Sequence, residues 1–145
     1  MATVSFTLSD HVEELDLVGN AAADGTGNGR NNMIFGNSFA NVLDGRGGDD
    51  TLYGGLDADT FVFVHSDGGF PIDDEEDVIW DFQAGVDRID LRQTEIDNWN
   101  DLNADSDGDG MEQVGNDVVI HTTDYDTVTL TNVQLSGLTQ ADFLF

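Results

Sequence analysis

The sequence has no cysteine, no lysine, a single proline and no long run of apolar residues. Without cysteine, the fold has no disulfide bonds to rely on, even in an oxidising compartment. No stretch of about eighteen apolar residues is present, so no transmembrane helix is expected. The opening residues 1–3 lack the basic and apolar segments of an N-terminal signal peptide. A chain of 145 residues predicts one domain or two small packed subdomains.

Positive charge is scarce, because four arginines face 30 aspartates and glutamates and give a formal net charge of −26. Such a chain repels nucleic acids and anionic membranes and attracts cations. Aspartate outnumbers glutamate about four to one, and short carboxylates suit tight turns and loops that bind hard cations. A halophilic surface is the alternative, but the acidic residues here fall at fixed places in repeats and loops. We expect cation binding, no nucleic acid partner and no membrane insertion.

Sequence signatures of common hydrolases are also missing. There is no H-E-x-x-H and no G-x-S-x-G motif, which excludes the usual zinc-protease and serine-hydrolase patterns. His11, His65 and His121 are spread over separate segments. Carboxylates are so numerous that a chance pair at glycosidase spacing means little. The sequence therefore predicts a protein that is not an enzyme, with a structural or solvent-facing role for His65.

A nine-residue period fills residues 27–62. In nines, this stretch reads GNGRNNMIF, GNSFANVLD, GRGGDDTLY and GGLDADTFV. Glycine opens every unit, position six is Asn or Asp, and position eight is a large apolar residue. These residues are Gly27, Gly36, Gly45 and Gly54, then Asn32, Asn41, Asp50 and Asp59, then Ile34, Leu43, Leu52 and Phe61.

The period predicts a coiled stack of turns and short strands. Positions one to six are glycine-rich and polar, which favours turns. Positions seven to nine are apolar or β-branched, which favours short strands with position eight pointing inward. Two nines make one coil, so turns eighteen residues apart lie on the same edge, one strand spacing apart. A metal ion between turns requires that geometry.

The repeat resembles the calcium-binding nonapeptide G-G-x-G-x-D-x-U-x of the RTX (hemolysin-type calcium-binding) family. Residues 77–91 read D-x-I-x-D-F-x-x-G-x-D-x-I-D-L. They are similar to the segment that follows the last repeat in type I-secreted RTX proteins, such as serralysin-like proteases and the R-modules of alginate epimerases. The resemblance implies an all-β fold, a short parallel β-roll capped by and continuous with antiparallel β-strands. It also implies Ca²⁺ as the cofactor.

The resemblance also implies a ligand set for each inter-turn site. One turn gives the carbonyls of positions two and four and the position-six side chain. The next turn on the same edge gives the carbonyls of positions one and three and its position-six side chain, and all these oxygens suit Ca²⁺. One site would use Asn28, Arg30 and Asn32 with Gly45, Gly47 and Asp50. The other would use Asn37, Phe39 and Asn41 with Gly54, Leu56 and Asp59.

The expected sites are graded along the stack. Asn32 and Asn41 are neutral, so the first two repeats form either weak sites or asparagine turns that need no metal. The last two repeats keep Asp50 and Asp59 and should share their ions with acidic residues downstream. These later sites are more acidic and should bind Ca²⁺ more strongly. Their further ligands are Arg46, Gly48, Gly55 and Asp57. We expect Asp67, in the loop at residues 65–68, to lie opposite Asp50. We expect the acidic residues 73–77, which end at Asp77, to lie opposite Asp57 and Asp59.

A second metal candidate is D-x-D-x-D-G at Asp105, Asp107 and Asp109. It matches the front half of an EF-hand-type loop. The last position of such a loop would be Asn116 rather than a bidentate glutamate, and no helical flanks are predicted. The alternative is an open, solvated loop.

The remaining segments predict short strands on either side of the repeats. Residues 3–26 are expected to form an N-terminal cap around a turn at residues 9–11, residues 27–64 the β-roll, and residues 65–145 a C-terminal β-cap. Within that cap, strands are expected on either side of a turn at Ala84 and Gly85. Further expected strands lie at residues 118–121 and 127–133. The ending Asp142-Phe143-Leu144-Phe145 resembles the uncleaved export signal of this family, and the alternative is a plain last β-strand.

Together these patterns predict a non-catalytic calcium-binding RTX module of a larger secreted protein. It would fold on Ca²⁺ outside the cell, support type I secretion through the export apparatus, and be monomeric in isolation. The alternatives are a carbohydrate-binding module for an alginate-like polysaccharide, or the tail of a surface adhesin. A polyanion would need a basic groove, which four arginines make hard to build.

Overall fold

The computed structural model describes residues 4–64, 75–104, 110–122 and 126–145. Within these ranges the chain is almost entirely β-structure. The strands are β1 (Phe6–Thr7), β2 (Glu14–Asp16), β3 (Gly25–Thr26), β4 (Met33–Phe35), β5 (Val42–Asp44), β6 (Thr51–Tyr53), β7 (Thr60–Val64), β8 (Glu76–Ile79), β9 (Arg88–Gln93), β10 (Gly110–Val114), β11 (Asp117–His121), β12 (Thr127–Leu130) and β13 (Phe143–Leu144). The helical segments are α1 (Trp99–Ala104), η1 (Leu135–Gly137) and η2 (Gln140–Asp142). None of these helices is long and apolar enough to cross a bilayer.

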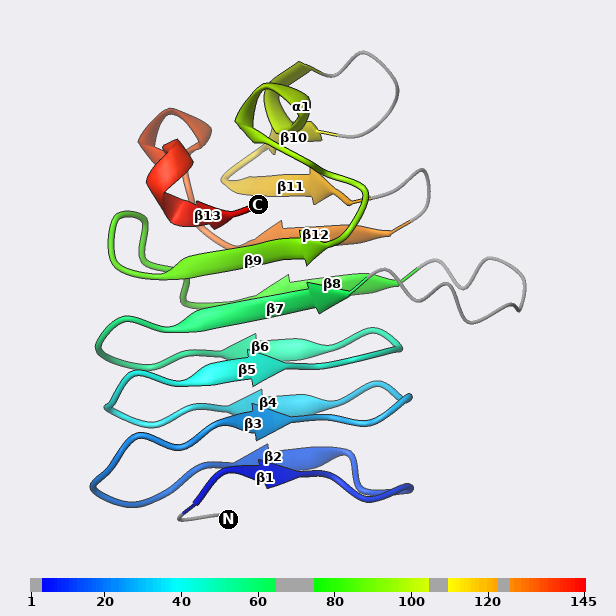
Figure 1. Ribbon diagram of the computed structural model, residues 1–145, viewed down its shortest axis with the longest axis vertical. Helices are drawn as coiled ribbons and strands as arrows, with labels where there is room; N and C mark the ends of the chain where they lie inside the picture. Colours follow the sequence, from blue (N-terminus) through cyan, green and yellow to red (C-terminus); the bar gives the residue numbers. More distant parts are fainter. Residues whose placement is uncertain (1–3, 65–74, 105–109, 123–125) are drawn as a thin grey trace.

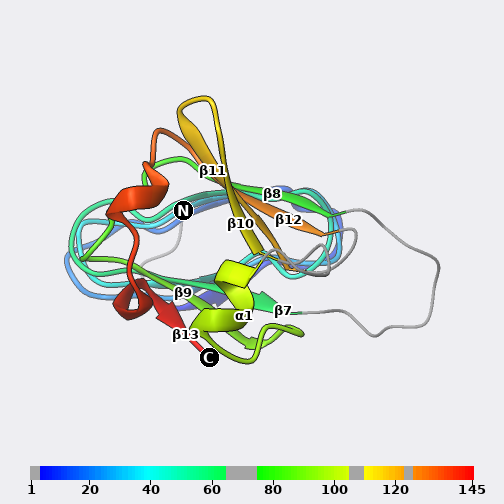
Figure 2. The same cartoon turned by 90° about the horizontal axis from the view of Figure 1, so that it is seen from above.

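Two sheets lie face to face and form a flattened roll (Figures 1 and 2). One sheet has the order β1-β3-β5-β7-β9-β13 and is parallel throughout. The other has the order β10-β11-β12-β8-β6-β4-β2, with antiparallel pairing only among β10, β11 and β12. Successive strands from β1 to β9 alternate between the sheets, so each pair of strands makes one coil. The predicted parallel β-roll continuous with antiparallel strands is confirmed.

The register follows the nine-residue period. Ile34 pairs with Leu52 in one sheet, and Leu43 pairs with Phe61 in the other, each eighteen residues apart. These position-eight side chains are fully buried between the sheets. Burying such a side chain contributes about 1.5–3 kcal/mol. The stack is therefore held together by one large apolar residue from each short strand.

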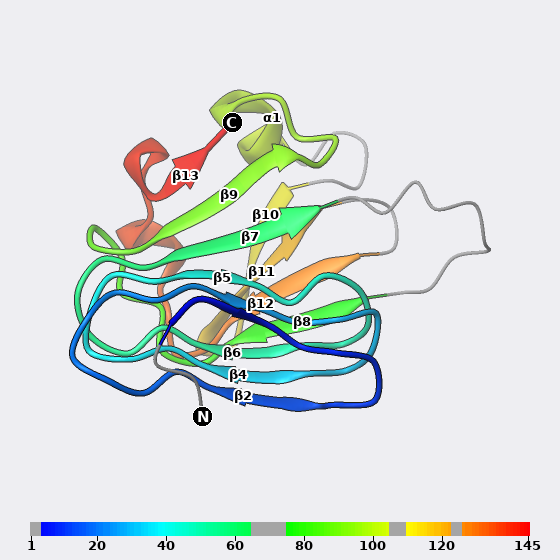
Figure 3. The same cartoon turned by 60° about the horizontal axis from the view of Figure 1, so that its bottom comes forward.

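The stack continues beyond the four repeats at both ends. Figure 3 brings forward the N-terminal coil formed by β1 and β2, in which Leu15 pairs with Ile34. At the other end Ile79 of β8 pairs with Leu52, and Ile89 of β9 pairs with Phe61. Asp77-x-Ile79 and Asp87-x-Ile89 thus repeat the D-x-U pattern, at spacings of 27 and 28 residues instead of 18.

The C-terminal part closes the upper end of the roll. Strands β11 and β12 form the expected antiparallel pair, and β13 is the expected last strand, parallel to β9. Strand β10 and helix α1 were not expected from the sequence. The helix begins where Asn98 Oδ1 accepts hydrogen bonds from the backbone N–H groups of Asn100 and Asp101, at 3.0 and 3.2 Å. Helix α1 has only six residues and one fully buried side chain, Leu102. It is therefore too short to show a helical period in the sequence.

Aromatic side chains stack along the roll at the ends of three neighbouring strands. Phe35 and Tyr53 have ring centroids 4.7 Å apart and nearly parallel planes. Tyr53 stacks in turn on Trp80 at 6.2 Å. Rings in neighbouring coils contribute about 0.5–1.5 kcal/mol per pair beyond the area they bury. The stack therefore supports the same parallel register as the core.

Candidate metal centre

Turns of the roll gather on two edges, here named edge A and edge B. Edge A, on the right in Figure 1, consists of residues 8–13, 27–32, 45–50 and 75–77. Edge B, on the left, consists of residues 17–24, 36–41, 54–59 and 80–87. Each edge presents one turn per coil, one above the other.

On edge A, the position-six residues form a ladder of hydrogen bonds between coils. The N–H of Asn32 donates to Asp50 Oδ1 at 2.7 Å. The N–H of Asp50 donates to Asp77 Oδ1 at 2.9 Å. Each carboxylate is therefore anchored to the coil before it, and Asp77 takes the place of a position-six residue in the coil that follows the repeats.

Edge B carries the same ladder. The N–H of Asn41 donates to Asp59 Oδ1 at 2.8 Å, and the N–H of Asp59 donates to Asp87 Oδ1 at 3.0 Å. A second carboxylate, Asp81, accepts from the N–H groups of Gly54 and Gly55 at 2.8 and 2.9 Å. Asp87 and Asp81 thus join the last repeat to the coil above it.

Repeats three and four each contain a carboxylate oxygen with no hydrogen-bond partner. Asp50 and Asp59 are each 1% exposed, and their Oδ2 atoms are buried and unpaired. Leaving a buried acceptor unsatisfied costs about 1–3 kcal/mol, and more when the group is charged. These two oxygens therefore mark where a cation would be most strongly favoured.

The first two repeats show why these oxygens are left over. In those turns the position-two N–H satisfies the position-six side chain: Asn28 donates to Asn32 Oδ1 at 2.7 Å, and Asn37 donates to Asn41 Oδ1 at 2.8 Å. In the third repeat the N–H of Arg46 donates instead to Asp44 Oδ1. In the fourth, the N–H of Gly55 is used by Asp81. Both acidic turns have lost their internal donor.

The backbone of the acidic turns differs in the same way. Positions two and four of the third repeat, Arg46 and Gly48, have φ of 72° and 93°. The same positions in the fourth repeat, Gly55 and Asp57, have φ of 101° and 66°. No residue with positive φ occurs at residues 27–32 or 36–41, which the structure describes in full. The acidic turns and the asparagine turns are thus two distinct conformations.

Glycine at position one allows the turns to stack closely. A Cβ at Gly27 would lie 2.3 Å from the carbonyl oxygen of Gly45, and a Cβ at Gly36 would lie 2.2 Å from that of Gly54. Both distances are far inside van der Waals contact. The carbonyl oxygens of Gly45 and Gly54 therefore face the preceding turn on their edge, where only glycine leaves room for them.

Burial raises the pKa values of the edge A carboxyls. The pKa of Asp50 is raised to about 7 and that of Asp77 to about 8, chiefly because both are buried. The negative charges of Glu75 and Asp49 raise both values further, while the hydrogen bonds of the ladder oppose the shift. Two buried carboxylates this close together are poorly stable as anions without a cation.

Edge B has the same electrostatic character. Burial is the largest cause that raises the pKa of Asp59 to about 7, and the charges of Asp87, Asp81 and Asp57 add to it. Burial also raises the pKa of Asp87, helped by the charge of Asp81. The two edges therefore carry equivalent acidic centres, each between a repeat turn and the coil above it.

The asparagine turns satisfy their polar groups without a cation. Asn28 Nδ2 donates to the carbonyls of Ser9 and Val12 at 3.0 and 2.8 Å. Asn41 Nδ2 donates to the carbonyl of Ala23 at 2.6 Å. In these turns an amide N–H thus satisfies carbonyls of the coil below without a metal.

Comparison with known proteins decides what the repeats are. The sequence pattern of the RTX calcium-binding nonapeptide repeat matches residues 26–61 in four copies. Residues 26–61 are RTX calcium-binding repeats. RTX repeats bind Ca²⁺, so the acidic turns described above belong to a calcium-binding β-roll.

Solved structures with a similar fold come from a lipase and an epimerase. The extracellular lipase LipA of Serratia marcescens matches with a TM-score of 0.59 and 17% identity, over 92% of this chain and 19% of the lipase. The AlgE6R3 subunit of the Azotobacter vinelandii mannuronan C5-epimerase matches with a TM-score of 0.57 and 21% identity, over 91% of this chain and 78% of that chain. At these identities the likeness shows the β-roll fold. No curated protein sequence matches the chain.

The RTX donor set fits the residues present. Among the described residues, no three His, Asp or Glu side chains gather into a metal site of their own. The RTX pattern implies that backbone carbonyls supply most of the ligands for a cation on either edge. Hard carbonyl and carboxylate oxygens are the ligands Ca²⁺ prefers, and the unpaired Oδ2 atoms of Asp50 and Asp59 supply the charged part.

The structure places the predicted repeat residues on the expected edges. Edge A contains Asn28, Arg30, Asn32, Gly45, Arg46, Gly47, Gly48 and Asp50, and edge B contains Asn37, Phe39, Asn41, Gly54, Gly55, Leu56, Asp57 and Asp59. Asp67, Asp105, Asp107 and Asp109 lie outside the described residues. Which of these residues bind the ions stays a prediction.

The predicted pairing of Asp77 is wrong. Asp77 was expected opposite Asp57 and Asp59, but it lies on edge A and pairs with Asp50. The partner of Asp59 is Asp87, which sequence reasoning missed together with Asp81. The reason is that β8 follows β7 across edge A, so residues 75–77 return on that edge. The available signal was the recurrence of D-x-I at residues 77–79 and 87–89.

Asn41→Asp tests whether the asparagine turns work without calcium. In the variant a carboxylate would face the carbonyl of Ala23 in a site that is 2% exposed. We expect a loss of about 1–3 kcal/mol even in saturating calcium, hence a melting temperature several degrees lower by circular dichroism. Asn116→Asp, which adds the same charge at an exposed position, is the control. A variant that melts above the wild type in calcium would mean that this turn is a calcium site lacking only its carboxylate.

Proposed function

We propose that this chain is a non-catalytic module that folds on calcium outside the cell and thereby supports type I secretion of a larger protein. The observation that carries the proposal is the pair of buried, unpaired oxygens, Asp50 Oδ2 and Asp59 Oδ2. They lie at equivalent places on the two edges, within a calcium-binding β-roll. A bound cation strongly stabilises a fold that buries bare carboxylate oxygens.

The proposed ligands follow from the contacts on each edge. On edge A, Asp50 and Asp77 would hold the ion together with carbonyls of the turn at residues 45–50. On edge B, Asp59 and Asp87 would do so with carbonyls of the turn at residues 54–59. Bound calcium supplies positive charge that the chain itself lacks. The residues of the chain orient the carboxylates and exclude water.

The thermodynamics suit a switch between two compartments. Extracellular calcium modules bind with dissociation constants of about 10⁻⁴ to 10⁻³ M. Binding to the folded state alone stabilises it by RT ln(1 + [L]/Kd), which is about 1.4 kcal/mol per site at tenfold saturation. In a low-calcium cytosol the net charge of −26 instead favours a loose chain, which suits passage through an export channel.

The larger protein is also part of the proposal. The Serratia marcescens lipase with a similar domain is described as extracellular, and this chain spans 19% of it. By analogy, residues 1–145 would be one module, with the N-terminal cap at residues 3–26, the roll at 27–64 and the C-terminal cap at 65–145. The ending at residues 142–145 resembles an export signal, and a secreted location follows from the same analogy.

The placement of the arginines disfavours an alginate-like polyanion as the ligand. Arg30 and Arg46 lie on edge A, among carboxylates. Arg88 and Arg92 lie on β9, where Arg92 Nε donates to Asp90 Oδ1 at 2.9 Å. The positive charges are thus divided between two places, and a polyanion would lack a continuous basic groove.

A calcium titration followed by far-UV circular dichroism tests the proposal. We expect little β-structure in EDTA at neutral pH and a gain of β-structure with a midpoint of about 0.1–1 mM Ca²⁺, the range of extracellular modules. Magnesium at the same concentrations should act far more weakly, because it demands a small octahedral site. Identical β-rich spectra and equal melting temperatures in EDTA and in calcium would contradict the proposal.

A further inference from the structure

The carboxylate of Asp142 joins the end of the chain to edge B. Asp142 is 1% exposed. Its Oδ1 accepts a hydrogen bond from the N–H of Gly85 at 2.5 Å, 57 residues away in sequence. Its Oδ2 accepts from the N–H and the hydroxyl of Thr139, at 2.7 and 2.9 Å. Hydrogen bonds to a charged group are stronger than those between neutral groups, so this is a strong local anchor.

Gly85 belongs to the turn that forms the upper side of the edge B centre. That turn ends at Asp87, which accepts from the N–H of Asp59 below and from the N–H of Gln83 within the turn, at 3.0 and 2.8 Å. Gly85 itself has φ of 82°, a conformation that glycine adopts at no steric cost. The turn is thus held from below by the last repeat and from above by Asp142.

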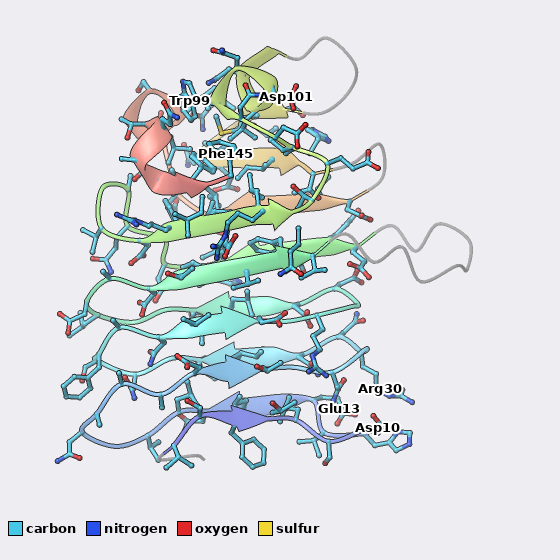
Figure 4. All side chains as sticks on the ribbon, in the orientation of Figure 1. Asp10, Glu13, Arg30, Trp99, Asp101 and Phe145 are labelled. Atoms are coloured by element: carbon cyan, nitrogen blue, oxygen red, sulfur yellow. The ribbon has the colours of Figure 1, made fainter. Side chains whose placement is uncertain are left out.

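The residues after Asp142 dock on the strand that leaves the same turn. Phe143 pairs with Ile89 of β9, and its side chain is 4% exposed. Its ring contacts Trp99 of α1, with centroids 5.6 Å apart, and Phe145 at 6.1 Å. Figure 4 shows Trp99 and Phe145 at the end of the roll opposite the N-terminal coil. Strand β9 starts one residue after Asp87, so a formed turn fixes where this segment can dock.

We propose that Asp142 is a positioning residue that couples docking of the C-terminal segment, residues 138–145, to calcium binding on edge B. The inference rests on the proposed function, namely that Asp59 and Asp87 hold calcium. An ion between them fixes the turn and presents the N–H of Gly85 to Asp142. By linkage, a docked Asp142 preforms the turn and strengthens calcium binding by the same factor.

The coupling is specific to one edge. The hydrogen bonds of the Asp142 side chain go to Gly85 and Thr139, and neither residue belongs to edge A. On edge A a different residue, Asp126, contacts the upper turn: its Oδ1 accepts a hydrogen bond from the N–H of Glu75 at 3.3 Å. A loss of Asp142 should therefore lower the calcium affinity of edge B and leave that of edge A unchanged. A general loss of stability would affect both edges.

A calcium titration of Asp142→Asn followed by NMR tests the coupling. Asparagine keeps the shape but turns one acceptor oxygen into a donor that faces an N–H group. Amide signals of Gly54 and Asp87 report edge B, and those of Gly45 and Asp77 report edge A. We expect edge B to bind about tenfold more weakly, within the usual range of coupling between sites, with edge A unchanged. Asp97→Asn, which removes an exposed charge, should leave both edges unchanged.

The outcomes distinguish the coupling from the proposed function. Equal weakening of both edges would show that Asp142 is merely structural, and unchanged binding would also overturn the coupling. A wild-type chain whose edge signals do not respond to calcium would overturn the proposed function as well. If the variant fails to fold, hydrogen exchange on the wild type decides: the amides of Gly85 and residues 139–142 should become protected at the calcium concentration that fills edge B. Full protection of these amides without calcium would overturn the coupling.

Discussion

Replacing both unpaired carboxylates, as in Asp50→Asn/Asp59→Asn, is expected to remove most of the stability that calcium gives this chain. The variant keeps the Oδ1 atoms that accept from Asn32 and Asn41, so the ladder can still form. It loses the two oxygens that carry the charge for binding. Two sites at tenfold saturation contribute about 3 kcal/mol. For a chain of this size, the calcium-induced rise in melting temperature should shrink by roughly 10 °C.

The same variant should be more stable than the wild type when calcium is absent. The first two repeats show how asparagine satisfies this position, since the amide of Asn41 donates to a carbonyl of the coil below. Melting curves with calcium and with EDTA measure both effects, and Glu95→Gln/Asp97→Asn, at exposed positions, controls for the change in net charge. A double variant with an undiminished response to calcium would rule out Asp50 and Asp59 as the central ligands.

Acidification is expected to replace calcium in part. A calcium-stripped chain should gain β-structure and melting temperature as the pH falls from about 8 to 5. The pKa values of Asp50 and Asp59 are raised to about 7 and that of Asp77 to about 8, in each case chiefly by burial. The folded state therefore binds protons more tightly than the unfolded state, in which aspartate titrates near 3.9. Stability rises as these groups take up protons.

The sign of this effect is opposite to that of an ordinary paired carboxylate. The destabilisation is fully present above the raised pKa values and is relieved progressively as the pH falls below them. The facing carboxylates act in the same direction: Glu75 and Asp49 on edge A, and Asp81 and Asp57 on edge B. Calcium should raise the melting temperature less at low pH, because it competes with protons for the same oxygens. Circular dichroism melts from pH 8 to 5 measure this, and a calcium-stripped chain most stable at pH 8 would contradict it.

The repeats made much of the fold predictable. Their period of nine sets the strand length, the inward position and the eighteen-residue coil, because each unit repeats the same choice between turn and strand. The pairs Ile34 with Leu52 and Leu43 with Phe61 follow directly. The contrast between asparagine and aspartate turns was also readable. Its physical basis is the loss of an internal donor from Arg46 or Gly55, which depends on contacts that the repeat pattern does not specify.

The downstream half of the centre was harder to predict, because the period is interrupted there. Asp77 follows Asp50 at 27 residues, and Asp87 follows Asp59 at 28, so counting by eighteen assigns the wrong edge. Asp142 was out of reach for a different reason. Its contact with Gly85 spans 57 residues and depends on how the C-terminal segment docks, for which no local pattern exists.

The most direct test is a crystal structure grown in millimolar calcium, with an anomalous difference map to locate the ions. We expect peaks beside Asp50 Oδ2 on edge A and Asp59 Oδ2 on edge B, bounded above by Asp77 and Asp87. We expect none where the amides of Asn28 and Asn41 donate to the coil below. Equal peaks at the asparagine turns, or no peak beside either aspartate, would contradict the account.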